Sequence, residues 1–501
     1  MGVNYTNKNS VMSTIIVLFI SALFLNTISV PAIDFGNGFN PLNNEDFDPL
    51  VDIEVTVEIL KIRSFDKYDK QINILPYNLS PIPKREYIDE NSNPDFYLKV
   101  LINNEEFVSD IWQDTKYIYS PDFSATLNVP DDQEFVDITI QLWDWNEDGD
   151  VLCDIGNEED DVDITYSIKT GHWTGEDQSN DPSGYGRLNG CDDGSIYIRD
   201  LDCELWFDIF QNDYDEDGIP YWTEINDYGT DPETDNSGED IDEDDVPIEW
   251  EWKWGYDPLL TEQHKNLDPD GDSIDNYEEF LTSQWNSDPY RKDLFIELDQ
   301  MEEGPNGESS FFPENSKEFL YTAYDRQNIV YHLDDGSWED TGSELITFDE
   351  LTTWYELQSI YQQYFLHGDQ NNWRRGVFHY GILIYQFDGP RGMAFGNNRF
   401  QLSSIGMEEK AEIKYFERDE VYASCYMHET GHTLGFWPIP GHNTFSTSPI
   451  RLGWWLSRPY KSCMNYGYMY YTVDYSDGSR PYRDYDDWSR MDLSYFEGEW
   501  G

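Results

Sequence analysis

The sequence predicts a multidomain protein: an N-terminal all-β sandwich, an acidic connector built from repeats, and a C-terminal α/β domain. Three observations support this division. Apolar and polar residues alternate in short runs from Val51 to Phe210, which is typical of antiparallel strands. An acidic pattern then recurs three times between Asp213 and Glu279. From Lys292 onwards, strand-like runs alternate with amphipathic helical segments, as in an α/β domain.

Length and charge limit the classes of protein that fit. A chain of 501 residues exceeds what one hydrophobic core normally organises, so about two to four domains are expected. The 101 acidic residues against 31 basic ones give a formal charge of -70, which excludes binding to nucleic acid through the overall field. The acidic residues therefore form either a solvated surface or ligand sets for cations, and their spacing separates these alternatives.

An apolar run covers residues 11–30, after Lys8 and before Pro31-Ala32. This order of charged, apolar and small residues predicts a signal peptide at residues 1–32 and a secreted protein. The alternative is an uncleaved anchor that keeps the protein at the cell surface, because the run approaches the length of a membrane span. We expect no other integral membrane segment.

Residues 33–210 are expected to form the sandwich. The runs VDIEVTVEILKI, DFYLKVLI and EFVDITIQLWDW alternate in polarity and are separated by turn-forming residues. The acidic loop DWNEDGD directly follows the third run, and with it the segment resembles a C2 domain. Acidic loops of C2 domains often hold calcium, so Asp144, Asn146 and Asp148 are candidate ligands, with a solvated turn as the alternative.

The acidic connector covers residues 211–291 and contains three copies of one pattern. DYDEDGIPYWTE, DIDEDDVPIEWE and DPDGDSIDNYEE each carry aspartate at positions 1, 3 and 5 and glutamate at position 12. Oxygen atoms at these offsets can surround a calcium ion, with the late glutamate reaching back from a helical turn. The predicted calcium ligands are Asp213, Asp215, Asp217 and Glu224; Asp240, Asp242, Asp244 and Glu251; and Asp268, Asp270, Asp272 and Glu279.

Position 6 of such a loop is normally glycine, which only the first copy has, as Gly218. Asp245 and Ser273 replace it in the other two copies, which predicts that the turn is made differently there. The run resembles EF-hand loops and the calcium-binding thrombospondin type 3 repeats. This resemblance implies that calcium stiffens a connector whose charges otherwise repel one another.

The C-terminal domain, residues 292–501, is expected to have an α/β order. A capping box of Thr347 and Glu350 predicts the start of its second helix. The expected elements are strand 292–301, helix 313–328, strand 329–335, helix 347–365, strand 377–388, an edge strand at 392–404 and helix 417–434.

The last of these helices contains HETGHTLGF. His428 and His432 are four residues apart, so both imidazoles project from one face and can meet one zinc ion. Glu429 sits beside the first ligand, where it can act as a general base toward water rather than bind the metal.

Gly435 stands three residues after His432, and SCMNY follows downstream with Met464 at its centre. HExxHxxG followed by a methionine turn is the pattern of metzincin metallopeptidases, and residues 292–501 resemble that superfamily on these two motifs. The resemblance implies that Met464 forms an apolar floor below the zinc. It also implies that Tyr466 binds zinc or stabilises the oxyanion, with an ordinary packed aromatic as the alternative.

The third zinc ligand departs from the metzincin pattern. The family places a histidine or aspartate three residues after the glycine, where this chain has Pro438. His442 follows four residues later, and a looped-out turn could return it to the metal, since short flexible loops close at little entropic cost. Asp474 and Asp477 are the alternative ligands.

Five cysteines leave at least one without an intramolecular partner. Cys425 lies one turn before His428, and Cys463 directly precedes Met464. Either a disulfide or two buried thiols would suit these two positions.

We therefore expect a secreted zinc metalloendopeptidase that acts on a protein or peptide substrate and is stabilised by calcium. The zinc would be held by His428, His432 and His442, with Glu429 and Tyr466 in catalytic roles. The main alternative is a calcium-dependent extracellular adhesin whose zincin-type domain is structural or inactive. Hydrolysis of a non-peptide amide is a further alternative.

Overall fold

The computed structural model describes residues 52–65, 93–130, 132–147, 149–157, 160–177, 186–193, 201–338, 343–413, 416–437, 439–480 and 482–497. All of them belong to one compact unit, Pro49–Gly501. The expected signal peptide, Asp148 and Pro438 lie outside the described residues. Among the described residues, no helix combines the length and the apolar character that a membrane span needs.

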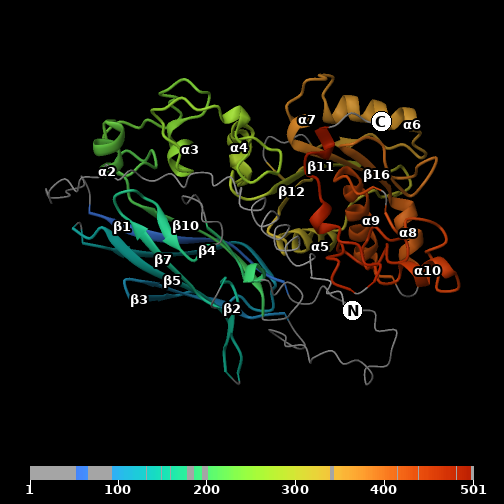
Figure 1. The fold of residues 1–501 in the computed structure, drawn as a ribbon, viewed down its shortest axis with the longest axis horizontal. Helices are drawn as coiled ribbons and strands as arrows, with labels where there is room; N and C mark the ends of the chain where they lie inside the picture. Colours follow the sequence, from blue (N-terminus) through green and yellow to red (C-terminus); the bar gives the residue numbers. More distant parts are fainter. Residues whose placement is uncertain are drawn as a thin grey trace, which may run out of the picture. The chain divides into compact units, whose positions relative to one another are not determined.

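The N-terminal segment folds into two antiparallel sheets, as predicted (Figure 1). One sheet has the order β4-β1-β10-β9, and the other has the order β3-β2-β5-β7-β8, with β6 paired to β5. The strands are β1 (Glu54–Ser64), β2 (Phe96–Ile102), β3 (Glu105–Val108), β4 (Tyr117–Asn128), β5 (Phe135–Asp144), β6 (Val151–Cys153), β7 (Val162–Ser167), β8 (Trp173–Gly175), β9 (Gly186–Asn189) and β10 (Cys203–Gln211).

Alternation along the strands creates the core between the two sheets. Val55 and Val57 on β1 are buried, and the residues between and beside them are exposed or half-buried. Trp173 on β8 packs against Phe207 on β10, with ring centroids 5.7 Å apart, so side chains of one sheet contact those of the other. Every second side chain points inward, and this is why the alternation of apolar and polar residues in the sequence predicted an antiparallel sandwich.

The connector consists of three acidic loops, each followed by a short helix: α2 (Tyr221–Thr223), α3 (Ile248–Lys253) and α4 (Asn276–Thr282). Position 6 has a left-handed backbone in all three loops, with φ of 89° at Gly218, 82° at Asp245 and 78° at Ser273. The prediction that the turn would be made differently without glycine is therefore wrong. The second and third loops adopt the same turn with side chains that tolerate it less well.

Replacing Ser273 with glycine should therefore raise the free energy of unfolding. A residue with a Cβ in the left-handed region costs about 1–2 kcal/mol, partly offset by the greater freedom of glycine in the unfolded chain, so we expect a gain of about 0.5–1 kcal/mol. Urea unfolding measures it. Ser273→Ala keeps the Cβ and should give no gain; equal gains for both variants would contradict the explanation.

The C-terminal segment is a mixed sheet with helices on both faces. The strand order is β12-β11-β14-β16-β15, and β13 also pairs with β11. All of these pairings are parallel except that of β15 with β16. The elements are β11 (Asp293–Met301), α5 (Glu314–Asp325), β12 (Val330–Asp334), β13 (Leu345–Ile346), α6 (Trp354–Ile360), α7 (Arg374–Val377), β14 (Phe378–Ile384), β15 (Gly392–Ala394), β16 (Arg399–Ser403), α8 (Ser404–Ala411), α9 (Arg418–Thr433) and α10 (Leu452–Ser457).

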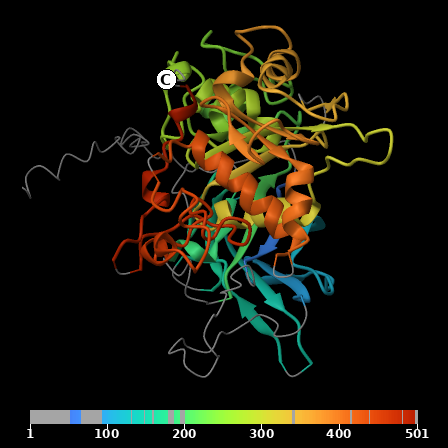
Figure 2. The same cartoon turned by 90° about the vertical axis from the view of Figure 1, so that its right-hand side faces the viewer.

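Strand β11, which pairs with β12, β13 and β14, is buried along its whole length and contributes side chains to two cores. Leu294, Ile296 and Leu298 face one core, which they share with α5 and α9. Phe295 faces the second core, which lies against α6. Helix α9 packs against α5, α8 and the strand pair β15–β16, and Figure 2 shows the orange helices in front of these strands. The HETGHTLGF helix is therefore held on three sides.

Two predicted boundaries in this segment are wrong. Helix α6 begins after Thr353, whose capping box is made with Glu356, and not at the pattern of Thr347 and Glu350. The expected single edge strand at 392–404 is instead two strands, β15 and β16, which pair as a hairpin. Of the two, β15 has no further strand beside it in the sheet order of the described residues.

Candidate active site and metal-binding loops

Helix α9 places three functional side chains at one end of the domain. His428, Glu429 and His432 are 1%, 3% and 5% exposed, respectively. The rings of His428 and His432 lie with their centroids 4.9 Å apart, as expected for residues one helical turn apart. Gly435, with φ of 80°, follows the helix in the left-handed conformation that commonly ends one.

The turn after the helix brings His442 back to these residues. His442 Nε2 lies 3.2 Å from His428 Nε2, and its ring centroid is 5.0 Å from that of His432. One ligand atom from each of the three imidazoles lies within 4.8 Å of the others. Gly441, with φ of 79°, makes this possible because its backbone passes directly against the Asn465 side chain, where a Cβ would collide.

The segment Ser462–Tyr466, which contains Met464, packs against helix α9. His428 Nδ1 donates a hydrogen bond of 2.8 Å to the carbonyl oxygen of Cys463, so Nδ1 carries the proton and the Nε2 lone pair faces His442. Met464 is fully buried, and a Cβ on Gly431 would lie only 2.6 Å from its sulfur. Burial lowers the pKa of His428 to about 3 and that of His442 to about 4, so both rings are neutral near pH 7. These are the properties of imidazoles that can bind a metal ion.

Glu429 lies below the edge strand β15. A Cβ on Gly392 would be 2.5 Å from Glu429 Oε1, so only glycine fits at that point of the strand. Burial raises the pKa of the Glu429 carboxyl to about 8, and a hydrogen bond from the backbone N–H of Ala394 opposes that rise. A carboxyl this poorly hydrated is suited to proton transfer once a nearby cation favours its ionised form.

Aromatic rings complete the surroundings of the three histidines. The Tyr466 ring centroid lies 4.2 Å from that of His442 and 5.6 Å from that of His428. Burial is the main cause that raises the pKa of Tyr466 to about 12, which keeps its hydroxyl protonated as a hydrogen-bond donor. Trp437 stacks on His432 with centroids 4.2 Å apart, a contact that the sequence did not suggest.

The two alternative ligands lie elsewhere. Asp474 accepts a hydrogen bond from the Trp488 indole, and Asp477 accepts one from the backbone N–H of Ser479. Neither carboxylate belongs to the group formed by the three imidazoles.

Replacing Gly441 with alanine should disturb both the turn and the grouping of the three imidazoles. The left-handed backbone and the contact with Asn465 together should lower the free energy of unfolding by about 2–4 kcal/mol, and zinc content should fall with it. Gly368 has nearly the same φ, 78°, with nothing within 4 Å of the place a Cβ would take, so Gly368→Ala isolates the backbone cost. Equal losses in the two variants would show that the contact with Asn465 does not matter.

The first acidic loop brings its four predicted ligands together. Asp213, Asp215, Asp217 and Glu224 each offer an oxygen within 4.8 Å of the others. Backbone N–H groups fix two of the carboxylates: Gly218 donates to Asp213, and Ile219 donates to Asp217. Glu224 reaches back from the helical turn that continues α2, as the pattern predicted.

The second and third loops assemble only partly in the same way. Asp240, Asp242 and Asp244 form one group in the second loop, but Glu251 is grouped with Asp244 and His264 instead. In the third loop the three aspartates, Asp268, Asp270 and Asp272, form a group without Glu279. Burial, together with the negative charges of Asp293, Asp272 and Asp270, raises the pKa of the Glu279 carboxyl.

Unpaired buried oxygens show that these loops fit a cation. Asp215, Glu224, Asp242, Glu251, Asp270 and Glu279 each have at least one buried carboxylate oxygen without a hydrogen-bond partner. A buried, unpartnered carboxylate is costly unless a positive charge stands close to it. All-oxygen donor sets at these offsets suit calcium.

Each loop is also tied to a residue well downstream of it. The second carboxylate oxygen of the position-5 aspartate accepts the N–H of Asn236, Glu262 or Asp293, which follow it by 19, 18 and 21 residues. These three residues were not predicted from the sequence. The signal available was a polar residue at a nearly constant distance after each loop.

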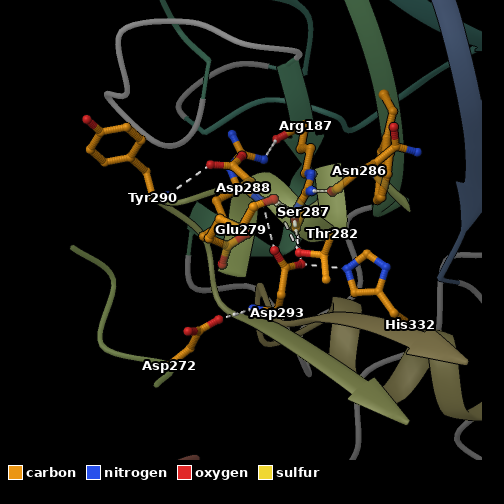
Figure 3. Close-up of polar contacts among 12 residues, drawn as sticks. Arg187, Asp272, Glu279, Thr282, Asn286, Ser287, Asp288, Tyr290, Asp293 and His332 are labelled. Carbon is orange, nitrogen blue, oxygen red and sulfur yellow. Dashed lines mark hydrogen bonds and ion pairs between the residues drawn. The ribbon is translucent and has the colours of Figure 1, made fainter. Parts of the chain in front are cut away.

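The third of these links joins the connector to the α/β sheet (Figure 3). Asp272 accepts the N–H of Asp293, the first residue of β11, at 2.7 Å. The Asp293 carboxylate in turn accepts the N–H of Asp288 and lies 2.6 Å from His332 Nε2 on β12. The third acidic loop is therefore hydrogen-bonded directly to the first residue of β11.

Two remaining expectations concern the sandwich loop and the cysteines. Both Asp144 oxygens accept internal hydrogen bonds, from the backbone of Asp95 and the side chain of Asn146, so this carboxylate anchors the loop. All five cysteines are buried and none forms a disulfide, which favours thiols at Cys425 and Cys463.

Comparison with known proteins identifies no relative by sequence. No known family model matches the sequence, and no curated protein matches it. Solved structures similar to about a third of the chain include a C2 domain, at 11% identity and a TM-score of 0.19, covering 32% of this chain and 98% of that one.

They also include a pair of C2 domains from extended synaptotagmin 2, at 8% identity and a TM-score of 0.19, covering 33% of this chain and 42% of that one. Human GIVD cytosolic phospholipase A2 matches at 12% identity and a TM-score of 0.18, covering 32% of this chain and 16% of that one. TM-scores this low carry no argument, and the sandwich rests on its own strand pairings.

Proposed function

We propose that this protein is a secreted zinc-dependent metalloendopeptidase of the metzincin type, stabilised by calcium. One observation carries the proposal: the three imidazoles of His428, His432 and His442 converge within 4.8 Å beside the buried Glu429. Zinc bound there would act as a Lewis acid on the scissile carbonyl and acidify the attacking water.

The residues of the chain supply the remaining parts of the reaction. Glu429 would take a proton from the water as it attacks the carbonyl carbon and deliver it to the departing amine nitrogen. The Tyr466 hydroxyl, kept protonated by its surroundings, would donate a hydrogen bond to the developing oxyanion. The Cys463 carbonyl holds the His428 ring in the orientation that directs Nε2 toward the site.

Strand β15 is the proposed binding surface for the substrate backbone. It forms the edge of the sheet and passes directly over Glu429, as the close approach of Gly392 indicates. An extended peptide that pairs with this edge would lie next to both Glu429 and the three histidines. This position favours an endopeptidase, since a paired strand can extend past the site in both directions.

The test is zinc content together with casein cleavage for the wild type and His442→Ala. We expect the variant to lose most of its zinc and its activity, because only two protein ligands remain. His367→Ala is the matched control, since this imidazole is 44% exposed and belongs to none of the metal-ligating groups among the described residues.

The outcome also separates the proposal from the adhesin alternative. A wild-type protein that binds zinc but cleaves neither casein nor other peptides would favour an inactive zincin-type domain. Full zinc occupancy in His442→Ala would exclude His442 as a ligand without excluding the family.

A further inference from the structure

The second acidic loop contains a nitrogen donor that the first loop lacks. His264 Nε2 lies 3.2 Å from Asp244 Oδ2, 3.5 Å from Glu251 Oε1 and 3.8 Å from Glu262 Oε2. Ligand atoms about 2.0–2.2 Å from one small ion lie about 3–3.6 Å from each other. The spacing around His264 is therefore close to that of atoms that share an ion.

Apart from these contacts with one another, the atoms that face this point have no hydrogen-bond partner. They include both oxygens of Glu251 and Nε2 of His264. Glu251 is 0% exposed and His264 is 1% exposed, so water is not in contact with these groups. Buried carboxylate oxygens directed at one point need a positive charge there, which either a metal ion or a protonated His264 would supply.

Comparison with the first loop shows why the ion should differ. Both loops have the same left-handed turn and the same backbone hydrogen bonds to positions 1 and 5. The first loop offers oxygen donors only, and the residue two positions after its downstream link, Gly238, has no side chain to contribute. Calcium takes oxygen ligands, whereas imidazole suits zinc and related transition metals.

The surroundings of the His264 ring fix its direction. The ring is held edge-on by Trp250 and Tyr256, with centroids 5.8 and 5.0 Å away. On its other side, Nδ1 lies 3.2 Å from the Asn276 amide nitrogen, while the Asn276 oxygen has no partner. A half-turn of this amide would let Nδ1–H donate to the oxygen, which leaves the Nε2 lone pair directed into the loop.

We infer that Asp244, Glu251 and His264, whose ligand atoms lie within 4.8 Å of one another, form a binding site for a divalent transition-metal ion of the zinc class. The site is separate from the three-histidine centre and differs in metal preference from the calcium-type loop that precedes it. It does not depend on the proposed peptidase function.

Metal stoichiometry of the full chain tests the inference. Protein stripped with a chelator is reloaded with zinc in the presence of excess calcium, and bound zinc is counted by mass spectrometry. We expect His264→Gln to bind one zinc equivalent fewer than the wild type. Glu224→Gln, the matched change in the first loop, should bind as many as the wild type.

The result can be read whether or not the peptidase proposal holds. A His428→Gln, His432→Gln protein should lose a different equivalent, and addition of His264→Gln should remove the last one. If the three-histidine centre binds no zinc, the wild type binds one equivalent and His264→Gln binds none. An unchanged count in His264→Gln, or complete displacement of this zinc by calcium, would overturn the inference.

A second measurement needs no substitution at this buried site. In wild-type protein loaded with cadmium-113 and labelled with nitrogen-15 in histidine, a cadmium resonance coupled to a single imidazole nitrogen is expected. The absence of such a resonance would overturn the inference, because His264 would then carry a proton and itself supply the positive charge.

Discussion

Replacing Glu429 with glutamine is expected to reduce kcat/KM for casein by about 10²–10⁴-fold, while zinc content stays unchanged. The amide keeps the size of the side chain below β15 but cannot accept a proton from water. Glu429 does not belong to the group formed by the three imidazoles, so this substitution should leave the proposed zinc binding intact. The effect should fall on kcat more than on KM, because proton transfer occurs in the transition state.

The control must remove a carboxylate without touching the site. Glu412 is exposed at the end of α8, and Glu412→Gln makes the same change in charge. This variant should cleave casein at the wild-type rate. If Glu429→Gln also cleaves as fast as the wild type, the proposed role of Glu429 is wrong.

Calcium is expected to stabilise the protein strongly through the first and third loops. An ion that binds only the folded state contributes about 2.7 kcal/mol per site at a concentration of 100 times Kd. Glu224→Gln and Glu279→Gln should each remove most of one contribution. Without calcium the order of stability should reverse, because each substitution replaces a carboxyl that has at least one buried oxygen without a hydrogen-bond partner. Urea unfolding at several calcium concentrations measures this effect. Plotted against calcium concentration, the free energies of unfolding of the wild type and of each variant should cross.

Glu216→Gln is the control within the first loop. Glu216 is exposed at position 4, where the pattern requires no ligand, so the same loss of charge should not change the calcium dependence. Parallel curves for the wild type and Glu224→Gln would contradict the assignment of Glu224 as the closing ligand.

The sequence predicted the elements better than their boundaries, and α6 shows why. Two segments, TFDE and TWYE, both carry the capping pattern, and the earlier one was chosen. In the structure Thr352 exchanges backbone hydrogen bonds with Gln386 and Asp388, which holds the chain extended until Thr353. That pairing joins residues more than thirty positions apart, so no local pattern could show it.

The candidate site was predictable where spacing alone places residues together. One helical turn brings His428 and His432 to the same face, and a repeat with fixed offsets gathers Asp213, Asp215 and Asp217. His442 could be named only as one of three options, because its position depends on how Gly441 packs against Asn465. His264 was missed because it lies 20 residues after Asp244, outside the twelve positions of the repeated pattern.

The link between Asp272 and Asp293 has a consequence for the order of assembly. Asp293 begins the strand to which β12, β13 and β14 all pair, so the sheet has its anchor only after the last loop is ordered. We propose that this loop binds calcium, and ion binding and loop folding are one event in sites of this type, so the anchor would form where calcium is abundant. We therefore expect folding of the C-terminal sheet to depend on calcium. In a calcium-poor compartment, the chain would contain the HETGHTLGF sequence but would lack the ordered sheet against which its helix packs.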